Sequence, residues 1–195
     1  MKSICVFCGS NAGTNPEYAE AAKQLGYLLV ENDIRLIFGG GNVGLMGIIA
    51  DAVLEKGGEV IGVIPHFLMD KEVGHTGLTE MKLVNTMHQR KELMAELSDA
   101  FITMPGGIGT MEEFFEIFTW GQLGLHPKPF GILNVDGYYD HLLAFFETMV
   151  SQRFLSQKNY EMLYASKIPA DLLQLLKDYK PNVEHQEKWL DRTRT

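Results

Sequence analysis

The chain has 195 residues, of which 46% are hydrophobic and 22% charged, so it can bury one sizeable core and has ordinary globular composition. Its formal net charge of −8 argues against a broad nucleic-acid surface, because such surfaces are rich in Lys and Arg. The charge does not exclude an anionic small molecule, since local N–H groups and one or two cations can bind a phosphate within an acidic protein.

The hydropathy of the chain predicts a cytoplasmic protein. We find no run of about 18 apolar residues that could span a membrane. The first residues, Met1 to Cys8, enter a strand pattern directly and lack the longer apolar segment and cleavage site of a secretory signal. We expect residues 1–180 to form a single nucleotide-binding α/β domain and residues 181–195 to form a polar tail.

Short apolar strand patterns alternate with helical patterns along the chain. Residues 3–8 predict a strand, and Pro16 after Asn15 predicts a capped helix that runs to about Glu31. Further strands are expected at 34–38, 59–64, 81–85, 100–104, 130–135 and 164–166, and further helices at 87–97, from Met111 onward, and at 138–150, 152–164 and 171–179. This alternation predicts a Rossmann-like, doubly wound parallel sheet with helices on both faces.

Two patterns that could indicate metal or redox chemistry have simpler interpretations. Cys5 and Cys8 have C-x-x-C spacing, but both lie in an apolar strand, where residues three apart face opposite sides. We therefore predict buried structural thiols. The long loop from Pro65 to Thr79 contains His66 and His75, but their spacing does not indicate a metal site. We expect neither a metal nor an organic cofactor.

Three glycine-rich loops, at Gly9–Thr14, Gly39–Gly44 and Pro105–Thr110, leave the ends of predicted strands. In a parallel sheet, ligands bind at the carboxyl ends of the strands, where strand order reverses. We expect the loops to converge there on a nucleotide-like ligand. The second loop loosely matches G-x-G-x-x-G, but the next strand ends at Pro65 without the acid of an NAD site.

The stretch from Met104 to Glu113 predicts the end of a strand, a glycine turn and the start of a helix. Backbone N–H groups in a first helical turn lack internal partners, and the helix dipole makes that end positive. Gly106, Gly107 and Gly109 would let a phosphate approach closely. A competing interpretation is that Thr110-x-x-Glu113 is a capping box, in which Thr110 and Glu113 satisfy each other's N–H groups.

Glu113 would lie near the third or fourth helical position, within a few ångströms of the sugar of a nucleotide bound at this turn. A carboxylate there suits N-glycosidic cleavage, because it can stabilise an oxocarbenium-like transition state or activate water. Arg90 and Lys91 could bind the phosphate or orient the carboxylate. Alternatively, these two cations belong to an ordinary solvated helix face.

Six motifs make the chain resemble the Lonely Guy family of cytokinin-activating phosphoribohydrolases, often labelled lysine decarboxylases. The resemblance extends over about residues 3 to 165, and two motifs at their mutual spacing carry most of it: P-G-G-x-G-T-x-x-E and M-H-x-R-K. The motifs stand at Pro105–Glu113, Met87–Lys91, Cys8–Ser10, Gly39–Gly47, Trp120–Gly124 and Lys128–Asn134. Within the Pro105–Glu113 motif, Ile108 stands where family members commonly have Tyr. After the Cys8–Ser10 motif, Asn11 stands where they commonly have Ser.

The resemblance implies hydrolysis of N6-modified adenosine monophosphates to the free base and ribose 5-phosphate by a homodimer with active sites near its interface. It implies that Arg90 and Glu113 form the catalytic pair. The implied substrate contacts are Glu72, Arg90, Lys91, Gly106, Gly107, Ile108, Gly109, Thr110, Met111, Glu112 and Thr119.

Two other functions compete with this expectation. The first is a non-catalytic nucleotide-binding or sensing module that uses the same glycine turns. The second is the decarboxylase of the family's older label, which would need pyridoxal phosphate on a Schiff-base lysine. We find nothing in the sequence that identifies such a lysine.

Overall fold

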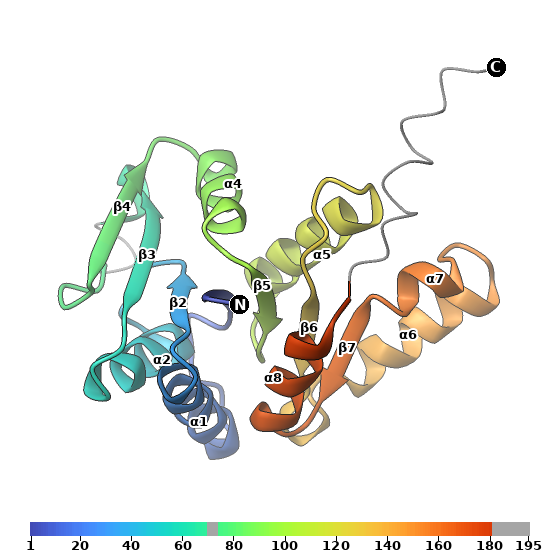
Figure 1. Cartoon of the computed structure of the whole chain (residues 1–195), viewed down its shortest axis with the longest axis horizontal. Helices are drawn as coiled ribbons and strands as arrows, with labels where there is room; N and C mark the ends of the chain where they lie inside the picture. The colour runs from blue at the N-terminus through green and yellow to red at the C-terminus, as the bar shows by residue number, and fades with distance from the viewer. Residues whose placement is uncertain (70–73, 181–195) are drawn as a thin grey trace.

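A seven-stranded parallel sheet forms the middle of the molecule in the computed structural model, which describes residues 1–69 and 74–180 (Figure 1). The strand order is β4-β3-β2-β1-β5-β6-β7, which confirms the predicted Rossmann-like fold. The strands are β1 Ser3–Phe7, β2 Arg35–Phe38, β3 Val60–Pro65, β4 Glu80–Val84, β5 Ala100–Thr103, β6 Phe130–Leu133 and β7 Leu163–Ser166.

Strand order reverses between β1 and β5. The chain moves outward from β1 to β4 and then returns to the other side of β1, where Ile4 pairs with Ala100 and Phe7 pairs with Thr103. The loops that leave β1 and β5 are therefore neighbours at the carboxyl edge of the sheet. This is the place where doubly wound sheets bind their ligands.

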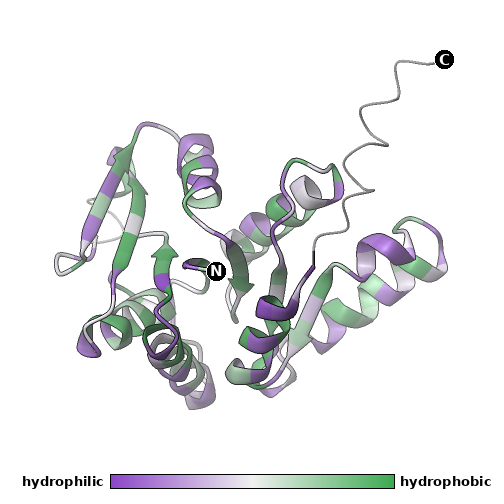
Figure 2. Ribbon diagram, in the orientation of Figure 1, coloured by the Kyte–Doolittle hydropathy of each residue, from purple (hydrophilic) through white to green (hydrophobic). Residues whose placement is uncertain are grey.

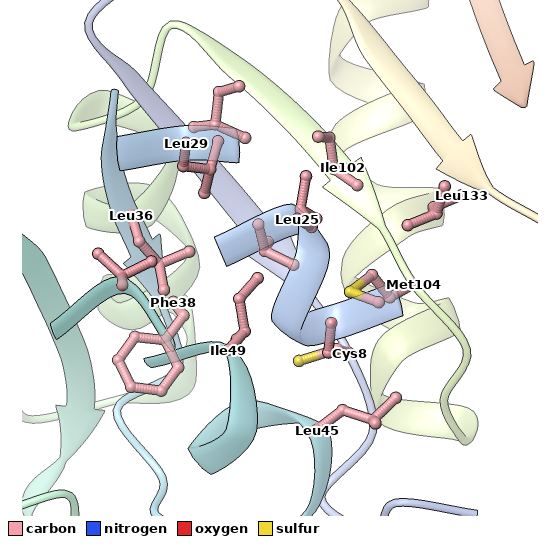
Figure 3. Packing of buried hydrophobic residues seen from close by; sticks show 14 of the residues in the cluster. Cys8, Leu25, Leu29, Leu36, Phe38, Leu45, Ile49, Ile102, Met104 and Leu133 are labelled. Atoms are coloured by element: carbon pink, nitrogen blue, oxygen red, sulfur yellow. The ribbon is translucent and has the colours of Figure 1, made fainter. Parts of the chain in front are cut away.

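Helices cover both faces of the sheet. α1 (Pro16–Glu31), α2 (Gly44–Glu55) and α8 (Pro169–Asp178) bury one core, part of which is drawn in Figure 3. α4 (Met87–Glu96), α5 (Ile108–Gln122) and α6 (Asp140–Ser151) bury the other. The remaining helices are short: α3 (His66–Met69), α7 (Gln157–Tyr160) and the 3-10 helix η1 (Val135–Gly137). In the described chain, every helix is too short or too polar to cross the hydrocarbon layer of a membrane.

The strands β1, β3, β5 and β6 are buried on both sides because each side packs against helices, whereas the edge strands β4 and β7 are partly exposed. Figure 2 shows this hydrophobic centre. Cys5 and Cys8 are both buried and free, and they belong to opposite cores. The prediction of buried structural thiols is confirmed. Across the described residues, no three His, Cys, Asp or Glu side chains are grouped so that they could hold a metal ion.

Most of the predicted helices and strands are present, with ends shifted by a few residues, and one predicted helix is wrong. The Asn15 side chain caps α1 by accepting the Glu17 N–H at 3.0 Å, as predicted. The predicted helix over 152–164 is wrong: α6 ends at Ser151, α7 is one turn long, and β7 begins at Leu163. The predicted tail 181–195 lies outside the described residues, so the division of the chain at residue 180 stays a prediction.

Substitution of Gly44 by Ala should destabilise the fold by about 2–4 kcal/mol, which lowers Tm by roughly 5–15 °C. Gly44 has φ +60°, and a Cβ there would lie 2.3 Å from the Ser10 carbonyl carbon. Gly57→Ala is the matched control, since Gly57 has φ +75° but open space around it. Equal losses in Tm for the two variants would show that the contact with Ser10 contributes nothing.

Candidate active site

The three glycine loops converge as predicted, through contacts between their backbones. The Gly9 N–H donates to the Pro105 carbonyl at 3.0 Å, and the Leu45 N–H donates to the Gly9 carbonyl at 3.0 Å. A Cβ on Gly106 would lie 2.9 Å from the Gly9 nitrogen. Side chains at these positions would force the loops apart, so glycine is what allows one site to form from three strand ends.

The helix after the glycine turn begins earlier than predicted. α5 starts at Ile108, with Gly107 as its N-cap in an extended conformation. Thr110 is therefore the third helical residue and Glu113 the sixth, so the capping-box interpretation of this pair is wrong. The predicted start at Met111 is also wrong, because the first turn of a helix tolerates residues such as Gly109 that lower helix propensity in its interior.

The carbonyl groups of residues 104–107 all have hydrogen-bond partners within the protein. Met104 O accepts the Tyr139 hydroxyl and Gly106 O accepts the Tyr138 hydroxyl, both at 2.7 Å. Pro105 O accepts the Gly9 N–H, and Gly107 O accepts the Met111 N–H at 3.1 Å. A Cβ on Gly107 or Gly109 would meet nothing within 4 Å. This geometry is that of a helix N-terminus open to an anion.

A cavity of about 260 Å³ lies beside this turn and contains both predicted catalytic residues. Arg90 reaches it from α4, and Glu113 reaches it from α5, while Gly107 to Thr110 form its edge. Thr110 is buried, and a Cβ on Gly106 would lie only 2.2 Å from its Oγ1. The structure thus brings the glycine turn at the start of α5, a guanidinium and a carboxylate into one space.

Arg90 is 5% exposed and donates from Nη2 to the Gly39 carbonyl at 3.1 Å. This contact ties α4 to the second glycine loop. A Cβ on Gly39 would lie only 2.0 Å from the same nitrogen, so glycine at this position makes room for the guanidinium. The alternative that Arg90 belongs to a solvated helix face is wrong.

Lys91 is also buried, but it faces α5 rather than the cavity. Its Nζ lies 2.6 Å from Glu112 Oε1 and 2.8 Å from Glu116 Oε2. Burial alone would lower the pKa of Lys91, but the hydrogen bonds to Glu112 and Glu116 raise it above its usual value. Lys91 is therefore charged at neutral pH and holds α4 against α5.

Glu113 affects the cysteine that shares its cavity. Burial, and then the charge of Glu113, raise the pKa of the Cys8 thiol well above its usual value. Cys8 lines the cavity, but at neutral pH it is protonated and unsuited to act as a thiolate nucleophile. Glu113 and Arg90 stay the predicted catalytic residues of this cavity.

The remaining predicted contacts fall in different places. Ile108 is 85% exposed at the edge of the cavity, and Glu112 lines it. Met111 instead packs against the core among the described residues. Thr119 is exposed, and its hydroxyl donates to the Phe115 carbonyl at 2.7 Å. Glu72 lies outside the described residues. The binding roles of all these residues stay predictions.

Sequence reasoning missed Tyr138 and Tyr139, whose hydroxyls support the glycine turn. It also missed His75. Its backbone N–H donates to the Gly40 carbonyl at 2.9 Å, and its ring Nε2 lies 2.9 Å from Asp51 Oδ1. A signal was present for the tyrosines, because Asp136-Gly137-Tyr138-Tyr139 follows the carboxyl end of a strand beside the site. Nothing in the local pattern indicates the partner of His75.

Comparison with known proteins identifies the family. Residues 46–176 match a family model described as "Possible lysine decarboxylase". The chain is 49% identical over 184 residues to cytokinin riboside 5'-monophosphate phosphoribohydrolase LOG7 of Arabidopsis thaliana, a match that covers 94% of this chain and 85% of that protein. It is also 49% identical to LOG1 of the same plant, over 94% of this chain and 86% of that protein. The chain belongs to this phosphoribohydrolase family.

Solved structures with the same fold are more distant from this member of the family. The molybdenum cofactor binding protein of Rippkaea orientalis superposes with a TM-score of 0.66 at 21% identity, over 91% of this chain and 96% of that one. The molybdenum cofactor carrier protein of Chlamydomonas reinhardtii gives a TM-score of 0.69 at 19% identity, over 90% and 95%. At these identities the likeness shows the fold alone.

Replacement of Gly39 by Ala should displace the Arg90 guanidinium while leaving the fold intact, because the flexible end of that side chain can move away. We expect kcat/KM for a nucleoside monophosphate to fall at least about tenfold, with Tm lowered by about 2–10 °C because the buried Gly39 carbonyl loses its donor. Placing Gly39→Ala in an Arg90→Ala background is the control. A further loss in that background would show that the methyl group acts through something other than Arg90.

Proposed function

We propose that this chain hydrolyses the N-glycosidic bond of N6-modified adenosine 5'-monophosphates, releasing the free base, a cytokinin or adenine, and ribose 5-phosphate. The observation that carries the proposal is the cavity that joins Arg90 and Glu113 to the first turn of α5. The names of relatives that match 94% of this chain support the same reaction. A cytoplasmic location stays a prediction from the sequence.

The 5'-phosphate is proposed to bind the N–H groups at the start of α5, where the helix dipole and open glycines favour an anion. A bound phosphate fixes the ribose beside Glu113, which is less than two helical turns further along the same helix. The phosphate therefore acts as the anchor that positions the glycosidic bond. A riboside without it would lack that anchor.

The reaction breaks the bond between C1' and the base nitrogen and forms a bond between C1' and a water oxygen. Positive charge develops on the ribose in the transition state, and the Glu113 carboxylate stabilises that charge or accepts a proton from the water. The departing base takes up one proton, so the products are neutral base and ribose 5-phosphate. Arg90, held by the Gly39 carbonyl, orients the carboxylate or the sugar phosphate through charge-assisted hydrogen bonds.

We also propose that the protein is a homodimer formed through the exposed face of α5. Ile108, Glu112, Phe115 and Thr119 recur at helical spacing along one side of this helix, and Ile108 and Phe115 are 85% and 37% exposed. Ile108 and Glu112 also border the cavity. A second copy packed on this face would lie next to the site, as the resemblance implies for the active sites of a dimer, and would cover Thr119.

Replacement of Glu113 by Gln should lower kcat for isopentenyl-adenosine monophosphate by about 10²–10⁴-fold, because the carboxylate charge is lost while its shape is kept. The nucleotide Kd should change little. Chromatography of the products from isopentenyl-adenosine monophosphate, adenosine monophosphate and the riboside would measure turnover and its dependence on the phosphate. Full activity of the variant would remove Glu113 from the mechanism, and nucleotide binding by the native protein without turnover would favour a sensing module.

Replacement of Phe115 by Glu should convert the dimer to a monomer, because a charge would be buried in the proposed interface. Sedimentation velocity would give the mass of each species. Phe154→Glu tests the effect of a new surface charge elsewhere, since Phe154 is 90% exposed and lies outside α5. The Tm of Phe115→Glu must also be measured, because Phe115 packs against Phe146 within the monomer. Dimers of unchanged affinity in Phe115→Glu would place the interface elsewhere.

A further inference from the structure

We infer that Tyr138 is a positioning residue for the substrate phosphate, because its hydroxyl fixes the peptide group that presents the Gly107 N–H. This inference rests on the proposed function and adds a residue that neither the motifs nor the catalytic pair identifies. It concerns a side chain from the far side of the turn, outside the cavity that holds Arg90 and Glu113.

The Tyr138 hydroxyl donates to the Gly106 carbonyl at 2.7 Å. The ring is itself held in place by two other tyrosines. It lies edge-on to Tyr18 with centroids 5.5 Å apart, and edge-on to Tyr139 with centroids 4.8 Å apart. A hydroxyl on a ring constrained from two sides sets the direction of the carbonyl it binds.

The Gly106–Gly107 peptide bond carries this constraint to the ligand. A trans peptide group is planar, with its C=O and N–H on opposite sides. Fixing the Gly106 carbonyl toward Tyr138 therefore directs the Gly107 N–H away from Tyr138. Gly107 lies between two hollows, one of about 270 Å³ beside Tyr18 and Tyr138 and the other containing Arg90 and Glu113. The N–H is thus turned toward the side of the proposed phosphate site.

Without the hydroxyl, this peptide group would have more freedom than its neighbours. Glycine on both sides lets it rotate into orientations that other residues disfavour. The Met104–Pro105 peptide group is more constrained, because one of the two torsions that turn it is the φ of Pro105, which the ring fixes. Tyr138 therefore acts on the peptide group of the turn whose rotation the backbone itself restricts least.

Tyr139 provides an internal contrast. Its hydroxyl donates to the Met104 carbonyl at 2.7 Å, but the next residue is Pro105, which has no N–H to present. Tyr139 is 3% exposed, whereas Tyr138 is 44% exposed. Loss of the Tyr139 hydroxyl leaves a buried carbonyl without its donor and should affect stability, whereas loss of the Tyr138 hydroxyl should affect phosphate binding.

The test compares Tyr138→Phe with Tyr139→Phe, each of which removes one oxygen atom. Calorimetry with ribose 5-phosphate should show a Kd about threefold to tenfold weaker for Tyr138→Phe, and the KM for the nucleoside monophosphate should rise similarly while kcat changes less than about twofold. The Kd for the free base, which has no phosphate, should stay the same. Tyr139→Phe should lower Tm by about 2–10 °C and leave the ribose 5-phosphate Kd unchanged.

Calorimetry separates failure of this inference from failure of the proposed reaction, because binding is measured without turnover. If the native protein binds ribose 5-phosphate but cleaves no nucleotide, the comparison of Kd values still decides the role of Tyr138. An unchanged Kd for ribose 5-phosphate in Tyr138→Phe would overturn the inference. So would an equal loss of affinity for the base and the sugar phosphate, or no ribose 5-phosphate binding by the native protein.

Discussion

The close approach of backbone segments at the reversal of strand order is the constraint on which the site depends. The Gly9 N–H reaches the Pro105 carbonyl, and Gly44 lies against the backbone of Ser10. These contacts require glycine because a Cβ would be closer than van der Waals contact allows. Since each loop also begins a helix or leads into one, the same contacts place the start of α5 beside the other two loops and open it to a ligand.

A second constraint sets the distance between the helices that carry the candidate catalytic pair. Successive residues on a helix point about 100° apart, so Arg90 can face Gly39 while Lys91 faces α5. The Lys91 side chain is 8% exposed where it contacts Glu112 and Glu116, and Glu112 is about half exposed. Buried ion pairs of this kind often contribute little to the free energy of unfolding, but this contact fixes the register of α4 against α5. The spacing of Arg90 and Glu113 is thus set by neighbouring residues.

The sequence was sufficient for the features that depend on local pattern. Alternating apolar strands and capped helices gave the sheet, and glycine spacing at Gly39–Gly44 and Pro105–Thr110 indicated where loops converge. It failed where partners distant in sequence decide the structure. The sequence left a solvated helix face open as an alternative for Arg90 and Lys91, because their partners, the Gly39 carbonyl and Glu112, are 51 and 21 residues away. The early start of α5 and the short α7 were missed because first-turn residues and isolated turns carry weak periodicity.

The protonated state of Cys8 has a consequence for the conditions in which the site can work. Oxidants and alkylating reagents attack the thiolate, and a low-pKa thiol is what makes a redox sensor. Here burial and the charge of Glu113 both oppose thiolate formation. The carboxylate proposed for glycosidic chemistry therefore also disfavours oxidation of the buried thiol beside it, and we expect activity to respond little to the thiol–disulfide balance of its surroundings.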